Sequence, residues 1–304
     1  MGSARLAQEA REREMDSVLG IGMLALLAAG LMASSASEEG TPASLGLPNA
    51  FFAMDTGTKD TAHQTAEAQA EMLAELGYDG IGYTGFANLP ELLRQLDARD
   101  LRLFNIYTAL RVNPDGSSYD EGLEPALPLF DGRDVVLWLT LTSDHWEPSD
   151  TAGDEQAVEV LRALAGKAAS AGVRIALYPH VNSWLERVED GVRVAEKVAR
   201  ENVGTSFNLY HWLRTDDPVN LRAVMTKAMP HLYFVTINGT NNEGSIETLD
   251  RCSFDMRGFL ATLKDLGYDG PIGLQGYGIG GDVHANLARS MGAWRTLAGA
   301  PRRP

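Results

Sequence analysis

Two histidines stand where short apolar runs of the chain end. His180 follows the run 174–179, and His211 follows the run 205–210. Neutral imidazole takes or gives a proton near pH 7, so either histidine is a candidate general acid or base. A buried histidine is also often a structural group that is simply hydrogen-bonded. Whether these two do chemistry therefore depends on what the fold brings near them.

The other apolar runs also end in polar or aromatic side chains, whereas run interiors such as 135–137 and 175–177 are apolar. The side chains at these ends are Asp55, Tyr83, Asn105, Tyr107, Thr140, Tyr178, Asn208, Asn238, Gln275 and Tyr277. Each of them alone has a structural explanation, because buried polar groups are usually just hydrogen-bonded. A sheet with a purely structural role does not require polar side chains to be concentrated at its strand ends. This concentration therefore predicts a ligand-binding site.

Strand and helix signals alternate along the chain from residue 50 onward. The eight predicted strands are residues 51–56, 80–84, 101–108, 135–141, 174–179, 205–210, 233–238 and 272–276. Helical periodicity predicts helices over 67–76, 154–171, 186–201, 255–266 and 283–297. Repeated strand–helix units predict a parallel sheet, and eight of them close a barrel. We therefore predict an α/β fold, the (β/α)8 TIM barrel, with the candidate residues on its carboxyl-terminal face.

Three connections have recognisable sequences. LGYDG occurs at 76–80 and again at 266–270, which predicts the same helix-to-strand turn at two equivalent junctions. The stretch 113–132 is predicted to be an elaborated connection over the barrel mouth. The glycine-rich run 276–281 is predicted either to bind an anionic group at backbone N–H donors or to form a plain tight turn.

Four segments in the carboxyl-terminal half carry a family resemblance. They are 175–180 (IALYPH), 207–212 (FNLYHW), 234–238 (FVTIN) and 268–275 (YDGPIGLQ). They are similar to the last four strands of the sugar phosphate isomerase/epimerase family of xylose isomerase-like TIM barrels. The similarity extends over residues 50–298 and is strongest in these strands.

The resemblance implies a divalent cation such as Mn²⁺ or Mg²⁺, bound by two glutamates, an aspartate and a histidine, that polarises a sugar carbonyl. This chain has Tyr178, Asn208, Thr236 and Gln275 at those four positions. A site without carboxylates lacks the charge that normally holds hard divalent cations. We therefore predict no metal ligands and no cofactor; the alternative is a softer cation bound by His180 and His211.

The resemblance also implies roles for the remaining candidates. His180 and His211 keep the family's histidine positions and are the predicted catalytic residues. Amides such as Asn208, Asn238 and Gln275 would hydrogen-bond sugar hydroxyls. The aromatic residues that would stack on a pyranose ring, or alternatively pack in the core, are Trp138, Tyr178, Trp184, Trp212 and Tyr277.

These roles predict a sugar isomerase- or epimerase-like enzyme that uses histidine acid/base chemistry on an unphosphorylated carbohydrate or keto-sugar. One alternative is a keto-glycoside lyase on the same barrel, because this fold does not fix the reaction. Another is a non-catalytic carbohydrate-binding protein that kept the pocket. The predicted partner is a small-molecule carbohydrate, and the sequence leaves the oligomeric state open.

Composition argues against nucleic-acid partners. The chain has 41 acidic and 26 basic residues, a net charge of -15, which repels phosphate backbones. This disfavours a nucleic-acid repair endonuclease on the same barrel. The single cysteine, Cys252, excludes an intramolecular disulfide and a cysteine-based metal cluster.

The amino-terminal region resembles an export signal. Arginines precede an apolar run over 18–32, and the small residues 34–36 suit a signal peptidase. We expect residues 1–36 to be the targeting segment, 37–49 a linker, 50–299 the barrel and 300–304 a tail. The predicted location is periplasmic or secreted, with no membrane association beyond the signal segment; an uncleaved anchor is the alternative.

Overall fold

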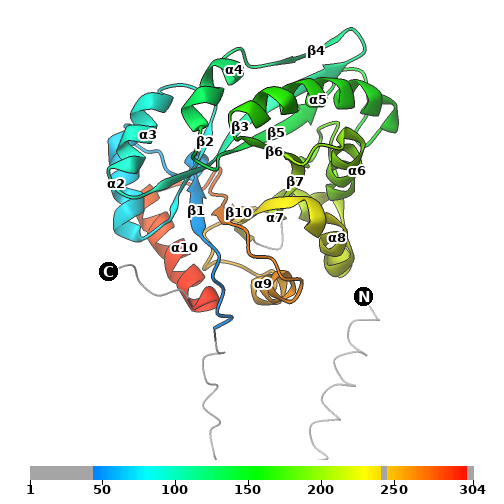
Figure 1. Ribbon diagram of the computed structural model, residues 1–304. Coiled ribbons are helices and arrows are strands. Elements are labelled where there is room, and N and C mark those ends of the chain that lie inside the picture. Colours follow the sequence, from blue (N-terminus) through cyan, green and yellow to red (C-terminus); the bar gives the residue numbers. More distant parts are fainter. Residues whose placement is uncertain (1–43, 241–244, 300–304) are drawn as a thin grey trace, which may run out of the picture. The chain divides into compact units, whose positions relative to one another are not determined.

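Eight parallel strands close on themselves in the computed structural model, which describes residues 44–240 and 245–299 (Figure 1). The barrel strands are β1 (Phe51–Met54), β2 (Gly80–Thr84), β3 (Arg102–Asn113), β5 (Val136–Thr142), β6 (Arg174–Leu177), β7 (Val203–Asn208), β8 (Leu232–Ile237) and β11 (Ile272–Leu274). Their spatial order is β2-β1-β11-β8-β7-β6-β5-β3, and pairing of β2 with β3 completes the ring. The predicted (β/α)8 barrel is confirmed, with every predicted strand present.

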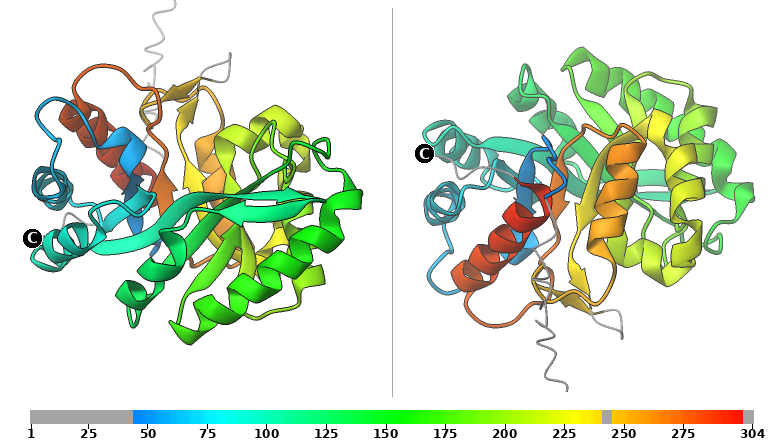
Figure 2. Two further views of the ribbon diagram at one scale, coloured as in Figure 1. Left: turned by 90° about the horizontal axis from the view of Figure 1, so that it is seen from above. Right: turned by 90° about the horizontal axis from the view of Figure 1, so that it is seen from below.

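Helices surround the ring, as Figure 1 and the views from above and below in Figure 2 show. They are α2 (Ala66–Leu76), α3 (Leu89–Asp97), α4 (Leu123–Ala126), α5 (Asp154–Ser170), α6 (Val188–Val198), α7 (Leu209–Thr215), α8 (Leu221–Ala228), α9 (Met256–Asp265) and α10 (Val283–Ala298). Short 3-10 turns are η1 (Asp55–Gly57), η2 (Leu127–Phe130), η3 (Thr151–Gly153), η4 (Pro218–Asn220) and η5 (Met229–His231). Within the described residues, no helix has the length and apolar character of a membrane span.

Strand side chains alternate between two apolar cores, as the pleat of a strand requires. Phe51 points outward and stacks on Trp294 of α10, with ring centroids 4.3 Å apart. Its neighbour Phe52 points inward and stacks on Phe104 at 4.5 Å. The inner core also contains Trp138, Tyr178 and Phe234. The barrel is therefore filled by aromatic side chains beneath the strand ends.

The repeated LGYDG sequence forms the same turn twice. Gly77 and Gly267 have φ angles of 80° and 78°, in the left-handed region that glycine adopts without steric cost. Each follows a helix and precedes a buried tyrosine, Tyr78 or Tyr268. The glycines end the helices and turn the chain into β2 and β11, which explains why the sequence recurs.

The connections show features that the sequence did not indicate. Near the end of the predicted linker 37–49, the backbone amides of Leu45 and Leu47 donate to the carbonyl groups of Leu297 and Ala298 in α10. The stretch after β3 is a hairpin: β3 pairs antiparallel with β4 (Gly116–Tyr119), which packs beside α5. A second hairpin joins β9 (Gly239–Thr240) to β10 (Ile246–Glu247). The predicted targeting segment 1–36, linker residues 37–43 and the tail 300–304 lie outside the described residues.

Candidate active site

Three of the four substituted metal-ligand positions form one hydrogen-bonded chain at the ends of β6, β7 and β8. The side-chain amide of Asn208 donates to Tyr178 Oη at 3.1 Å and to Thr236 Oγ1 at 2.7 Å. Its carbonyl oxygen accepts the backbone N–H of His211 at 3.1 Å and so caps α7. All three side chains are buried. Asn208 therefore ties three adjacent strand ends together and sets the start of the helix that carries His211.

The two candidate catalytic histidines lie in contact. The imidazole centroids of His180 and His211 are 3.9 Å apart, and the Tyr178 ring is edge-on to both at 5.3 Å. His180 Nδ1 lies 2.9 Å from the carbonyl oxygen of Val181. A carbonyl only accepts hydrogen bonds, so this contact places the neutral ring's proton on Nδ1 and leaves Nε2 as an acceptor. His180 is thus poised to receive a proton at Nε2.

Burial keeps this imidazole pair neutral. Removal from water lowers the pKa of His180 below its ordinary value of about 6.5. Burial, reinforced by the neighbouring His180 and Arg214, lowers the pKa of His211 to about 3. Within the described residues, Nδ1 of His211 is buried without a hydrogen-bond partner. Both rings are uncharged at neutral pH, which leaves them able to exchange protons with a ligand.

An aromatic group forms the floor beneath the histidines. Trp138 stacks on Tyr178 with centroids 3.8 Å apart, and Tyr107 meets both rings edge-on. Trp138 Nε1 donates to Ser206 Oγ at 2.7 Å. Thr140 Oγ1 lies 3.5 Å from the Tyr107 hydroxyl. Burial raises the pKa of the Tyr178 phenol well above its usual value, so this hydroxyl stays protonated.

The opposite side of the barrel mouth carries a charged group that the sequence indicated only in part. Asp55, at the end of β1, is buried, and its two carboxylate oxygens accept from Thr84 Oγ1 at 2.7 Å and from Lys59 Nζ at 3.0 Å. Lys59 also lies over the Tyr83 ring, 5.1 Å from its centroid. Sequence reasoning missed Lys59 and Thr84; the spacing of Asp55 and Lys59 by four residues at the end of a predicted strand was the available signal.

Two buried asparagines have polar atoms without partners in the described part of the chain. Both side-chain atoms of Asn105 on β3 lack a hydrogen bond, as does Oδ1 of Asn238 after β8. Asn238 Nδ2 donates to the carbonyl of Gly239 at 2.8 Å. Gly82 lies opposite Asn105, and a Cβ there would come within 2.7 Å of its amide oxygen. Unpaired buried amides are costly, so these two groups are suited to a ligand or an ordered water.

Three predicted residues stand apart from this cluster. Trp212 packs in the outer core, 5.4 Å from the Phe207 ring, which is the alternative that the sequence left open for this residue. Gln275 is half-buried and its backbone N–H donates to the carbonyl of Ile237. Tyr277, on the glycine-rich loop, is 65% exposed. The residues that cluster around His180 and His211 therefore come mainly from β3 and from β5 to β8.

The donor set does not fit the divalent cation that the resemblance implies. At Asn208 the amide nitrogen, not the carbonyl oxygen, faces Tyr178 and Thr236, and a protonated phenol is a poor ligand. Across residues 44–240 and 245–299, no three His, Cys, Asp or Glu side chains are grouped to hold a metal ion. The chain's own histidines are the groups available for proton transfer here.

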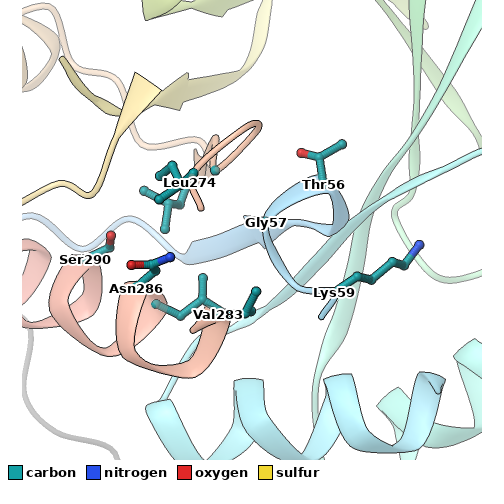
Figure 3. Close-up of a pocket in the computed structure, with 10 residues that line it drawn as sticks. Thr56, Gly57, Lys59, Leu274, Val283, Asn286 and Ser290 are labelled. Atoms are coloured by element: carbon teal, nitrogen blue, oxygen red, sulfur yellow. The ribbon is translucent and has the colours of Figure 1, made fainter. Parts of the chain in front are cut away.

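A small cavity of about 40 Å³ lies beside α10, next to the ends of β1 and β11 (Figure 3). Val283 and Asn286 of α10 face Leu274 across it. None of its lining residues is a predicted site residue. The first turn of α10 has acidic partners: Asp282 accepts the N–H of Ala285, and Asp60 accepts that of Val283. Two carboxylates therefore occupy a helix end that in many barrels binds phosphate.

Comparison with known proteins agrees with this architecture. A family model described as xylose isomerase-like TIM barrel matches residues 70–297. No curated protein matches the chain. Among solved structures, a 3-keto-D-glucoside 4-epimerase from E. coli has a TM-score of 0.65 at 16% identity, covering 81% of this chain and 98% of the other.

Two further structures are similar. A D-psicose 3-epimerase has a TM-score of 0.64 at 17% identity, with 82% of this chain and 99% of the other covered. A probable 3-DHS dehydratase, AsbF from Bacillus anthracis, has a TM-score of 0.64 at 14% identity, with 80% and 97% covered. At these identities the likeness is one of fold.

Proposed function

The chain belongs to the xylose isomerase-like TIM barrel family, and from this membership we propose that it is a sugar isomerase- or epimerase-like enzyme. Its substrate is an unphosphorylated carbohydrate or keto-sugar, and it works by histidine acid/base chemistry without the family metal. The observation that carries the proposal is the contact between His180 and His211 above a floor of aromatic rings. Similar folds named as 3-keto-D-glucoside and D-psicose epimerases support the substrate class.

In the proposed step, His180 Nε2 removes a proton from the carbon next to a ketone. The electron pair of the broken C–H bond moves into the C–C bond, and the carbonyl becomes an enolate. Neutral His211, which keeps one ring N–H, stabilises the enolate oxygen by hydrogen bonding. A solvent water gives a proton to the opposite face of the same carbon, which forms the epimer, and protonated His180 returns its proton to the hydroxide that is left. Return of a proton from His180 to the original face, after exchange with solvent, regenerates the substrate.

The charges around the site favour a neutral substrate. Asp60 and Asp282 cap the α10 end, and Lys59 at the rim is already paired with Asp55. Arg214, the cation that acts on His211, lies over the Tyr210 ring. A phosphate at this rim would face two carboxylates. Predicted export also argues against phosphorylated intermediates, which are cytoplasmic.

The test is solvent exchange in D₂O, followed by NMR on a panel of D-fructose, D-psicose and 3-keto-glucosides. Chelator-treated protein is expected to introduce deuterium next to the ketone and to form an epimer or isomer. Loss of the substituent β to the ketone would instead identify a keto-glycoside lyase. Binding of panel members without exchange or turnover would refute the enzyme proposal in favour of a carbohydrate-binding protein.

A further inference from the structure

A second pocket opens beside the histidine site, between the loops that follow β5 and β6. It encloses about 290 Å³, near the lower end of the range for ligand pockets, about 300 Å³. Its polar and aromatic lining includes Asp144, His145, Trp146, Glu147, Asn182 and Ser183. Both loops lie at strand carboxyl ends, so the pocket shares a face with His180 and His211.

The walls of this pocket are fixed by hydrogen bonds between the two loops. The backbone N–H of Ser149 donates to the carbonyl of Trp184 at 2.8 Å, and Trp184 Nε1 donates to the carbonyl of Asp150 at 2.8 Å. Asn113, at the end of β3, accepts from Ser143 Oγ at 2.9 Å. A pocket that is already ordered loses little conformational entropy when a ligand binds.

Gly153 leaves space for the two indole rings, Trp146 and Trp184, that line the pocket. A Cβ on Gly153 would come within 2.7 Å of the Trp146 ring and within 2.9 Å of the Trp184 ring. Its φ angle of -81° is one that any residue adopts. Close packing against the two indoles therefore explains glycine at this position, and it holds Trp146 half-buried at the pocket wall.

The lining chemistry matches a neutral sugar ring. The Trp146 indole is half-buried, with one edge against His145 at 5.2 Å, and offers an apolar surface for the C–H face of a pyranose. Glu147 supplies a carboxylate acceptor, and Asn182 an amide, for hydroxyl groups. Asp144 is paired with Arg111, which offsets its charge. A phosphate or a uronic acid in this pocket would still face the carboxylate of Glu147.

The pocket directly adjoins the histidine site. Ser183 lines it, and Ser183 Oγ lies 3.5 Å from His180 Nδ1. The backbone N–H of Ser183 also donates to the carbonyl of His180 at 3.0 Å. A ligand with one ring over His180 therefore has room for a second ring across Ser183, against Trp146.

We propose that this pocket is a second sugar subsite, which takes the neutral sugar or aglycone linked to the reacting ring. The substrate is then a glycoside of two rings rather than a free monosaccharide. This inference rests on the proposed function, because it takes the ring over His180 to be the one that reacts.

The test measures binding rather than turnover. Its result therefore does not depend on whether the proposed reaction takes place. Dissociation constants of maltose, cellobiose and trehalose, with glucose as the one-ring control, are measured by saturation-transfer NMR. We expect at least one disaccharide to bind about 10-fold more tightly than glucose, which corresponds to about 1.4 kcal/mol. Trp146→Ala should abolish that difference, and Trp146→Phe should keep most of it.

Tyr233→Ala is the matched control, since Tyr233 is a half-buried aromatic residue at the start of β8, away from this pocket. It should leave the preference for two rings unchanged. Glu147→Gln, at an exposed position, tests the subsite if Trp146→Ala does not fold, and should weaken disaccharide binding about threefold. Equal binding of glucose and all three disaccharides, or an unchanged preference in folded Trp146→Ala, would overturn the subsite. Deuterium exchange with keto-sugars remains the separate test of the reaction.

Discussion

Replacing Asn208 with alanine removes three hydrogen bonds from the centre of the site. The lost helix cap costs about 1 kcal/mol, and the two bonds to Tyr178 and Thr236 contribute about 1 kcal/mol each. We therefore expect the free energy of unfolding to fall by about 3 kcal/mol. For a domain of this size the melting temperature should fall by about 6–12 °C.

The assay is urea unfolding of Asn208→Ala, Thr236→Val and the double variant, followed by circular dichroism. Thr236→Val removes only the 2.7 Å bond from Asn208 Nδ2 to Thr236 Oγ1 and should cost about 1 kcal/mol. Because both single variants lose that bond, the double variant should cost about 1 kcal/mol less than the two single costs combined. Strictly additive costs, or a loss below about 1 kcal/mol for Asn208→Ala, would show that Asn208 does not hold these strand ends together.

Three other predictions concern pH and packing. His180 acts as a neutral base and burial lowers its pKa below the ordinary 6.5, so the midpoint of the fall in kcat/KM at acid pH should lie below pH 6.5. A midpoint above pH 6.5 would contradict this. The pKa of His211 is about 3 when folded and about 6.5 when unfolded, so its neutral folded form adds stability above pH 6.5 that is lost as the pH falls toward 3. His211 should contribute a slope of about 1.4 kcal/mol per pH unit within that window, so urea unfolding of His211→Gln should show a slope smaller than that of wild type by this amount. Gly273→Ala places a Cβ 2.5 Å from the Phe52 ring, so it should lower the free energy of unfolding by about 1–3 kcal/mol. Gly166→Ala on α5 meets no neighbouring side chain within 4 Å of its Cβ, so it should raise the free energy of unfolding by about 0.5–1 kcal/mol. Thermal unfolding of both variants measures the two changes.

The barrel was predictable because its strands are local apolar runs bounded by turn signals. The polar strand ends were equally visible, and the fold brings His180 and His211 into contact as the parallel arrangement requires. The hydrogen bonds of Asn208 were not predictable. They join residues 28 and 30 positions apart, and their geometry depends on the register between neighbouring strands.

The position of Trp212 follows from a strand end that the sequence analysis placed too late. The strand was predicted to continue to residue 210, but β7 ends at Asn208 and α7 begins at Leu209. Asparagine is a favoured helix cap, which was the overlooked signal. In a helix each residue turns by about 100°, so His211 faces the site while Trp212 turns into the outer core.

The sequence analysis did not predict the β3–β4 hairpin. Stretch 113–132 contains several glycines and prolines, which predicted an elaborated connection over the barrel mouth. Within it, Gly116 begins a strand that pairs with β3 and packs beside α5. The alternation of small and polar residues over Gly116–Tyr119 carries little hydrophobic signal. Tertiary pairing with β3, rather than local propensity, decides its structure.

The most direct test of the account is the rate of deuterium exchange next to the ketone, measured by NMR in chelator-treated buffer for wild type, His180→Ala and His180→Gln. If Nε2 of His180 removes the proton, both variants should lose exchange by about 100-fold or more while still binding the sugar. Exchange that persists at the wild-type rate in both variants, or that appears only when Mn²⁺ is added, would contradict a metal-free histidine mechanism.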